Sequence, residues 1–106
     1  MEYVWKYGEN DNQKYYECYI GKDYLCVMAN NWNLDIWFCI YEKQGIGMVT
    51  VMDKAYNRKM MKKYNVSEAE APLNKCQLLS GKKDDIEYLK RKLIHCYKNG
   101  KRMVTP

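Results

Sequence analysis

The chain has 106 residues, of which 47% are apolar and 29% charged, and this is the composition of one globular domain, residues 1–106, rather than of a disordered segment. No run approaches the roughly 20 apolar residues that cross a bilayer, and the first residues lack a secretory signal pattern, so we expect a cytoplasmic protein with no membrane partner. The net charge is +5, and five cysteines at wide, irregular spacing predict buried thiols rather than a metal site.

The first half of the chain, residues 1–53, predicts an antiparallel β-meander of about five strands. Runs rich in Tyr, Ile and Val alternate with turn residues at intervals of about a dozen residues or fewer, which suits sequential pairing of the strands. Gly21 permits a tight hairpin turn, because glycine adopts positive φ without steric cost. The expected strands are residues 3–7, 13–20, 24–29, 35–41 and 47–52, with a break at residues 8–12.

The second half, residues 54–100, predicts two or three helices. Asp53 is suited to cap a helix over residues 54–64, in which large apolar residues recur every four positions from Tyr56. A second helix over residues 66–80 has a weaker signal, because a proline limits its length.

The last helix has the strongest pattern. Asp84 and Glu87 can form a capping box at its start, and the pair Asn99-Gly100 is typical of a helix end. Its apolar stripe is Ile86, Leu89, Leu93 and Cys96 or Tyr97, and residues 101–106 form a tail. A meander followed by two or three helices packed on one of its faces is an α+β domain.

The predicted strands have an aliphatic face and an aromatic face. Leu25, Val27 and Ala29 of one strand, with Ile36, Phe38 and Ile40 of another, form the aliphatic set that we expect under the helices. The aromatic set has two interpretations: tyrosine pairs that stabilise the sheet, or a surface for partner binding or self-association. The residues of that aromatic surface are Tyr19, Tyr24, Trp37 and Tyr41.

Charge divides along the same boundary, because residues 1–53 are net acidic and residues 54–106 are net basic. The first predicted helix has no acidic residue after its cap, whereas an ordinary solvated helix mixes both signs. Its cations could be a solvated face, could contact phosphates or an acidic protein surface, or could be offset by the chain's own acidic residues. The predicted basic stripe comprises Lys54, Arg58, Lys59, Lys62 and Lys63, with Lys90 and Arg91 on the last helix.

The residue patterns that catalysis requires are not found in the sequence. His95 is the single histidine, and it lies beside Cys96 on a predicted helix, where adjacent side chains diverge. The segment CQLLSGKK, residues 76–83, departs twice from a phosphate-binding loop, and Gly45-Ile46-Gly47 fits a hairpin better than a dinucleotide fingerprint. We therefore expect no enzyme, no cofactor and no metal.

Three functional hypotheses follow from these patterns. The first is a non-enzymatic protein-binding module that inhibits a nucleic-acid-handling enzyme by occlusion, since the abundance of Lys, Asn, Tyr and Met is typical of small proteins from AT-rich bacteria and their phages. The second is a protein that binds nucleic acid directly, with basic helices on the backbone and Tyr or Trp on the bases. The third is a structural homodimer joined through the aromatic face.

Overall fold

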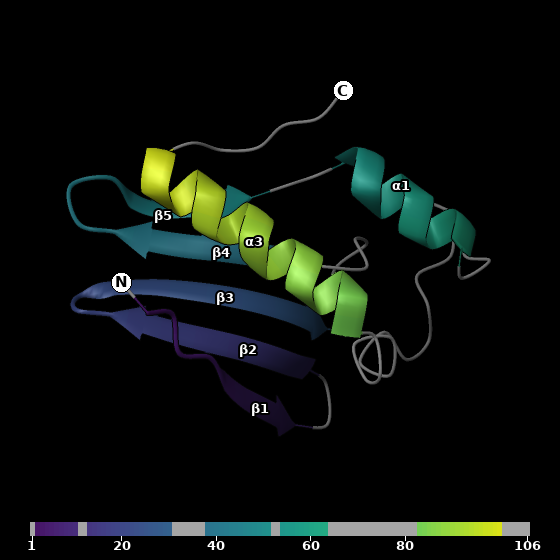
Figure 1. Ribbon diagram of the computed structural model, residues 1–106, viewed down its shortest axis with the longest axis horizontal. Coiled ribbons are helices and arrows are strands. Elements are labelled where there is room, and N and C mark those ends of the chain that lie inside the picture. Colours follow the sequence, from purple (N-terminus) through teal and green to yellow (C-terminus); the bar gives the residue numbers. More distant parts are fainter. Residues whose placement is uncertain (1, 11–12, 31–37, 52–53, 64–82, 101–106) are drawn as a thin grey trace.

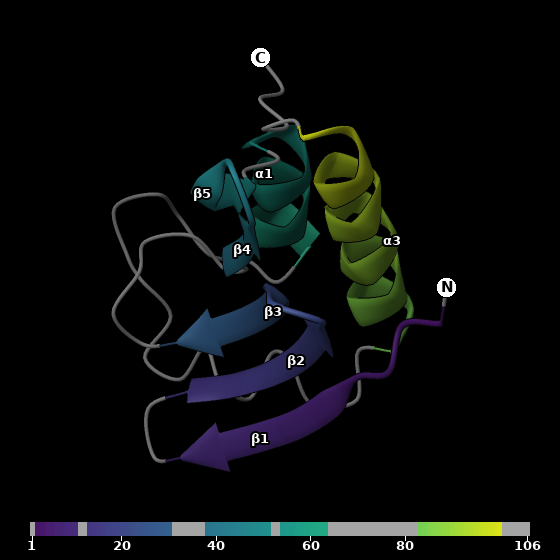
Figure 2. The same ribbon diagram turned by 90° about the vertical axis from the view of Figure 1, so that its left-hand side faces the viewer.

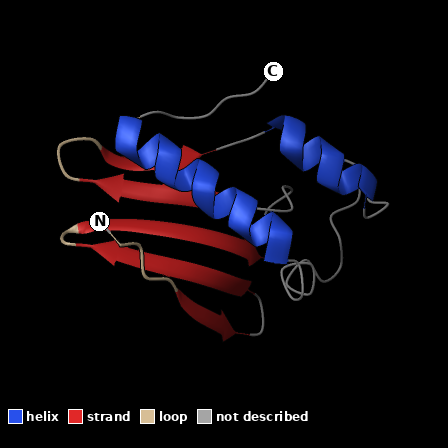
Figure 3. Ribbon diagram, viewed as in Figure 1, coloured by secondary structure: helices blue, strands red, loops and turns tan. Residues whose placement is uncertain are grey.

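A computed structural model describes residues 2–10, 13–30, 38–51, 54–63 and 83–100 of the chain. The described residues form a five-stranded antiparallel sheet and two helices, so the protein is an α+β domain, as the sequence predicts. Figure 3 distinguishes the helices, in blue, from the strands, in red. The elements are β1 (Lys6–Asn10), β2 (Gln13–Ile20), β3 (Asp23–Asn30), β4 (Phe38–Lys43), β5 (Gly47–Val51), α1 (Lys54–Lys63) and α3 (Lys83–Asn99).

The sheet is a meander in which spatial order equals chain order, from β1 to β5 (Figure 1). Every neighbouring pair is antiparallel. Gly21 has a φ of 58° in the two-residue turn between β2 and β3, which is the hairpin that the sequence predicts. Gly45 and Gly47 also have positive φ, and the amide of Ile46 donates to the carbonyl of Lys43 across the turn between β4 and β5.

The core lies between the sheet and α3, which crosses β3 and β4 (Figures 1 and 2). The apolar stripe predicted for the last helix is buried here, and Gly100 ends the helix with a φ of 61°. Tyr3 and Trp5 of the N-terminal segment pack against the same core. The buried cluster comprises Cys18, Leu25, Val27, Ala29, Cys39, Tyr41, Val51, Ile86, Leu89, Leu93, Cys96 and Tyr97.

Helix α1 lies beyond the ends of the strands and contacts the first turns of α3 (Figure 1). The ring of Tyr56 stacks on the ring of Tyr88, with centroids 4.3 Å apart. The Tyr56 hydroxyl donates to Oδ1 of Asp85 over 2.9 Å, and Lys63 Nζ lies 3.8 Å from Oδ2 of the same carboxylate. One buried aspartate of α3 therefore holds both ends of α1. The predicted helix over residues 66–80 and the tail lie outside the described residues.

The first strand differs from its prediction. Residues 2–5 are not in a strand, and β1 runs through Gly8, where the sequence predicts a break. A Cβ at Gly8 would come within 2.4 Å of the Tyr15 ring, so the glycine leaves room for a ring that lies across the backbone of β1. Glycine marks a close approach here rather than a turn.

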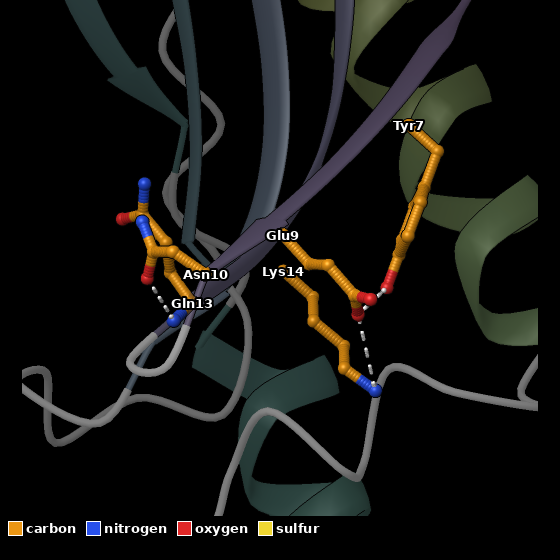
Figure 4. Close-up of polar contacts among 5 residues, drawn as sticks. All are labelled: Tyr7, Glu9, Asn10, Gln13 and Lys14. Atoms are coloured by element: carbon orange, nitrogen blue, oxygen red, sulfur yellow. Dashed lines mark hydrogen bonds and ion pairs between the residues drawn. The ribbon is translucent and has the colours of Figure 1, made fainter.

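Polar contacts fix the hairpin of β1 and β2 (Figure 4). Glu9 Oε2 accepts a hydrogen bond of 2.9 Å from the Tyr7 hydroxyl and lies 3.8 Å from Lys14 Nζ. The backbone amide of Gln13 donates to Oδ1 of Asn10 over 3.0 Å at the turn. The Glu9 carboxylate is therefore part of the hairpin's own structure.

The face assignment of β4 was wrong. Tyr41, predicted on the outer aromatic face, is 0% exposed and belongs to the core under α3, together with Cys39. Ile40, predicted under the helices, lies on the opposite face. The register pairs Tyr41 with Leu25, and strand-mates directly opposite each other share a face. Both faces of this strand are apolar, so its sequence alternation could not distinguish them.

Candidate functional site

The sheet face opposite α3 carries a group of large, exposed side chains. Tyr19 is 67% exposed and Met48 is 64% exposed. The register places Tyr19 opposite Tyr24, Tyr24 opposite Glu42, and Glu42 opposite Met48, so these residues form one row across four strands. We call the group of Glu17, Tyr19, Tyr24, Glu42 and Met48 the outer tyrosine patch.

The two tyrosines of the patch are held by one carboxylate. Glu17 Oε2 accepts a hydrogen bond of 2.6 Å from the Tyr24 hydroxyl and one of 3.4 Å from the Tyr19 hydroxyl. The rings are tilted against each other with centroids 4.9 Å apart, a favourable geometry for aromatic pairs. Tyr24 is half-buried, whereas most of Tyr19 is exposed to solvent. The two tyrosines of the patch are therefore held in place by contacts within the sheet.

Burial and the carboxylate keep both hydroxyls protonated. Burial raises the pKa of Tyr24 far above its ordinary value, and its hydrogen bond to Glu17 raises the pKa further. The negative charge of Glu17 raises the pKa of Tyr19. Because ionisation of either phenol would place a second negative charge beside Glu17, the two rings stay neutral around neutral pH.

The thiols beneath and around the sheet are buried. Cys26 lies under the outer tyrosine patch with 0% exposure, and burial raises its pKa to about 11, which suppresses the reactive thiolate. Cys18, Cys39 and Cys96 are also buried. The register pairs Cys18 with Leu25 and Cys26 with Glu17, so Cys18 and Cys26 lie on opposite faces of the hairpin. A disulfide between them is excluded by this geometry.

The predicted aromatic face is only partly assembled in the fold. Tyr19 and Tyr24 lie together on the outer face, whereas Tyr41 lies in the core on the other side of the sheet. Trp37 lies outside the described residues. Sequence reasoning missed Met48 and the two glutamates, which become neighbours of the tyrosines only through the register of three strand pairs.

The predicted basic stripe divides into two environments on α1. Lys54, Arg58, Lys59 and Lys62 are exposed, and we call these four residues the α1 cationic row. Lys63 is exposed as well, but its ammonium pairs with Asp85 of α3. The charge of Lys63 is thus offset by an acidic residue of the same chain, which comes from α3 and not from the sheet.

The cations predicted on the last helix also separate. Arg91 is exposed, whereas only 13% of the Lys90 side chain is exposed. Lys90 Nζ lies 4.5 Å from the ring centroid of Tyr16, 5.3 Å from that of Trp5, and 3.4 Å from Glu87 Oε1. Lys90 therefore secures the N-terminal segment to α3 and the sheet, a structural contact that the sequence did not indicate.

The outer tyrosine patch and the α1 cationic row are separate surfaces. Figure 1 places the turn after β2, next to Tyr19, at one end of the sheet and α1 beyond the other end. His95, on α3, is exposed and accepts a hydrogen bond from Asn99 at its backbone carbonyl. Neither helix in the described part of the chain has the length and apolar character needed to cross a membrane.

Comparison with known proteins gives no relative from which to transfer a function: no family model, no curated protein and no solved structure matches the chain.

Proposed function

We propose that the protein is a non-enzymatic protein-binding module, and that its partner is a nucleic-acid-handling enzyme whose working surface it occludes. The observation that carries the proposal is the outer tyrosine patch. Two rings in a fixed arrangement, with an exposed methionine in the same row, provide apolar contact area at a low entropic cost of binding. Tyrosine and methionine are both enriched at protein interfaces.

The rigid support of the patch favours recognition over a purely structural role. Cross-strand tyrosine pairs do stabilise sheets, by about 0.2–1 kcal/mol each. That role requires only that the rings touch each other. The 67% exposure of Tyr19 and the 64% exposure of Met48 leave apolar surface in water that a structural pair would not need. A partner that covers this apolar surface removes it from water, and this burial contributes favourably to the free energy of binding.

Direct binding of nucleic acid is the second candidate function, and the α1 cationic row favours it. Four exposed cations on one short helix can neutralise phosphates, with release of counterions. The row lies at the other end of the molecule from the outer tyrosine patch, so separate variants test the two functions independently.

Affinity capture from a lysate of the cells that encode the chain tests the first function. The bait proteins are the wild type, Tyr19→Ala, and Tyr7→Ala as the matched control. Tyr7 is an exposed tyrosine on the α3 side of the sheet, so its loss removes a ring of the same size from a different surface. We expect one partner that is retained by wild type and by Tyr7→Ala but lost with Tyr19→Ala, and whose nucleic-acid binding the wild-type protein inhibits. An identical set of captured proteins for all three baits would refute the proposal.

Titration with labelled oligonucleotides at two salt concentrations tests the second function. Direct binding predicts a steep loss of affinity with salt, and a shallower slope for the double variant Lys59→Glu, Lys62→Glu. Lys63 is left unchanged because a glutamate there would lie beside Asp85. Absence of binding at low salt removes this function. Light scattering that shows a dimer lost with Tyr19→Ala would instead support self-association through the patch.

A further inference from the structure

We propose that the outer tyrosine patch receives a cationic side chain, an arginine or lysine on a basic surface of the partner protein. This inference rests on the proposed function and adds the chemical class of surface that the partner presents. The patch combines two aromatic rings and a carboxylate, which are the groups that bind a guanidinium or ammonium ion in proteins.

The molecule contains a filled example of the same arrangement. Lys90 Nζ lies over the rings of Tyr16 and Trp5, and Glu87 completes the site with an oxygen 3.4 Å away. Three further lysines of the chain lie over tyrosine rings: Lys43 over Tyr97, Lys92 over Tyr88, and Lys98 over Tyr3. On the α3 side of the sheet, ring faces are thus repeatedly covered by ammonium groups from the same chain.

The outer tyrosine patch has the same components, without a cation from the described part of the chain. Lys6 lies opposite Glu17 in the register of β1 and β2, and Lys22 lies in the turn beyond Tyr19. Among the described residues, neither lysine forms an ion pair or a ring contact with the patch. Both hydrogen bonds to Glu17 end on Oε2, which leaves the lone pairs of Oε1 for a further donor.

The local charge favours a cation over a phosphate. Glu42 is exposed and lies opposite Tyr24, so the row of the patch carries a second carboxylate. Elsewhere in the sheet, the carboxylates of Glu9 and Asp23 accept hydrogen bonds within the fold. Two carboxylates repel a phosphate backbone, whereas an enzyme that grips nucleic acid does so with lysines and arginines. The patch therefore complements the basic working surface of such an enzyme.

Titration with short peptides tests the inference without knowledge of the partner. The probes are an oligo-arginine peptide and an oligo-glutamate peptide of equal length, followed by nuclear magnetic resonance of the labelled protein at low salt. We expect the arginine peptide to shift the signals of Glu17, Tyr19 and Tyr24, and the glutamate peptide to leave them unchanged. Shifts confined to other acidic residues, or equal shifts with both peptides, would overturn the inference.

Variants identify which groups bind the peptide. Glu17→Gln keeps an oxygen acceptor for both hydroxyls but removes the charge, and we expect it to weaken arginine-peptide binding roughly threefold to fivefold. Tyr19→Leu should weaken binding to a similar degree, whereas Tyr19→Phe, which keeps the ring, should not. Glu2→Gln is the matched control, since Glu2 is exposed in the N-terminal segment that lies along α3. An equal loss with Glu2→Gln would show that overall charge, not the patch, governs binding.

The same variants separate failure of this inference from failure of the proposed function. A captured partner could be lost with Tyr19→Ala but retained by the double variant Glu17→Gln, Glu42→Gln. In that case the protein is a binding module, but its patch does not bind a cationic side chain of the partner. If an oligonucleotide shifts the patch signals, both proposals are wrong. Circular dichroism of each variant confirms that the fold is retained.

Discussion

The hydroxyl of Tyr97, on the last turn of α3, donates a hydrogen bond of 2.6 Å to Oδ2 of Asp23, a residue 74 positions earlier at the start of β3. The same carboxylate accepts a 2.9 Å hydrogen bond from the backbone amide of Gln44. Lys43 Nζ donates to the carbonyl of Tyr97 over 2.7 Å, and the Gly100 amide donates to the same carbonyl over 3.3 Å, so this helix-end carbonyl has two donors. These contacts join the end of α3 to the turn between β2 and β3 and to the turn between β4 and β5.

Tyr97→Phe should therefore destabilise the protein while leaving the ring in place. Loss of this one hydrogen bond should lower the melting temperature by about 4–8 °C in a domain of this size. The matched control is Tyr7→Phe, which removes the hydroxyl that donates to the exposed Glu9. We expect a smaller change for the control in thermal unfolding followed by circular dichroism. Equal changes in melting temperature for the two variants would show that the hydrogen bond to Asp23 contributes no more to stability than the exposed one to Glu9.

The same pair predicts how stability depends on pH. Its hydrogen bond to Asp23 raises the pKa of Tyr97 to about 12, so the contribution of this phenol is fully present below its ordinary pKa and is lost as the pH rises toward 12. The Tyr97 hydroxyl, followed by the Gln44 amide, lowers the pKa of Asp23, so the contribution of the carboxylate disappears as the solution is acidified through that lowered pKa. In Tyr97→Phe, the pKa of Asp23 measured by nuclear magnetic resonance should rise.

Asp85 should control the attachment of α1. In Tyr56→Phe the stack on Tyr88 persists, but the largely buried Asp85 carboxylate loses the hydrogen bond from the Tyr56 hydroxyl, at a cost of about 1–2 kcal/mol in the free energy of unfolding. Hydrogen exchange should accelerate in α1 more than in α3. The control Lys63→Gln removes the ion pair between Asp85 and an exposed ammonium, and it should cost about 0–1 kcal/mol. A larger loss for Lys63→Gln would reverse the assigned order of these contacts.

Gly8→Ala should be destabilising through Tyr15. The added methyl group would lie 2.4 Å from a ring atom of Tyr15, so the ring must move away from β1. We expect a loss of about 1–3 kcal/mol, as is usual for overpacking, measured by urea unfolding. In the background Tyr15→Ala the same substitution should cost much less, because the obstructing ring is gone. Additive losses in this double-mutant cycle would show that the clash is not the cause.

Lys90 should behave as a structural residue and not as part of a binding surface. Lys90→Gln removes an ammonium that contacts Trp5, Tyr16 and Glu87, and should cost about 1–2 kcal/mol of unfolding free energy. Arg91→Gln, at the neighbouring exposed position, should stay within about 0.5 kcal/mol of wild type. Denaturant unfolding of the two variants compares them directly, and equal stabilities would contradict the assignment.

The fold class and the order of its elements could be predicted because their signals are local. Gly21 lies at the hairpin turn, Gly100 ends α3, and the apolar stripe from Ile86 to Tyr97 has a helical period. Each of these signals depends on residues close together in the chain. They required no knowledge of which strands and helices meet in space.

The errors concern contacts between distant residues. Tyr41 and Ile40 are both apolar, and only the pairing with β3 and the cover of α3 decide which of them is buried. Lys90 was predicted in a basic cluster, because nothing near it in sequence indicates that Trp5 and Tyr16 lie against it. Only the two tyrosines of the outer tyrosine patch were predicted, since Met48 and Glu42 become neighbours of Tyr24 through the register of the strands.

The meander has a consequence for how the chain matures. Every strand pairs with the strand that immediately precedes it, so the sheet can assemble in the direction of synthesis, with short loops to close at each step. In the described part of the chain, the helix that covers Leu25, Val27 and Tyr41 is α3, the last element to be synthesised. A nascent chain arrested before α3 should therefore expose the apolar face of the sheet. We expect such a chain to depend on a chaperone that the complete protein does not need.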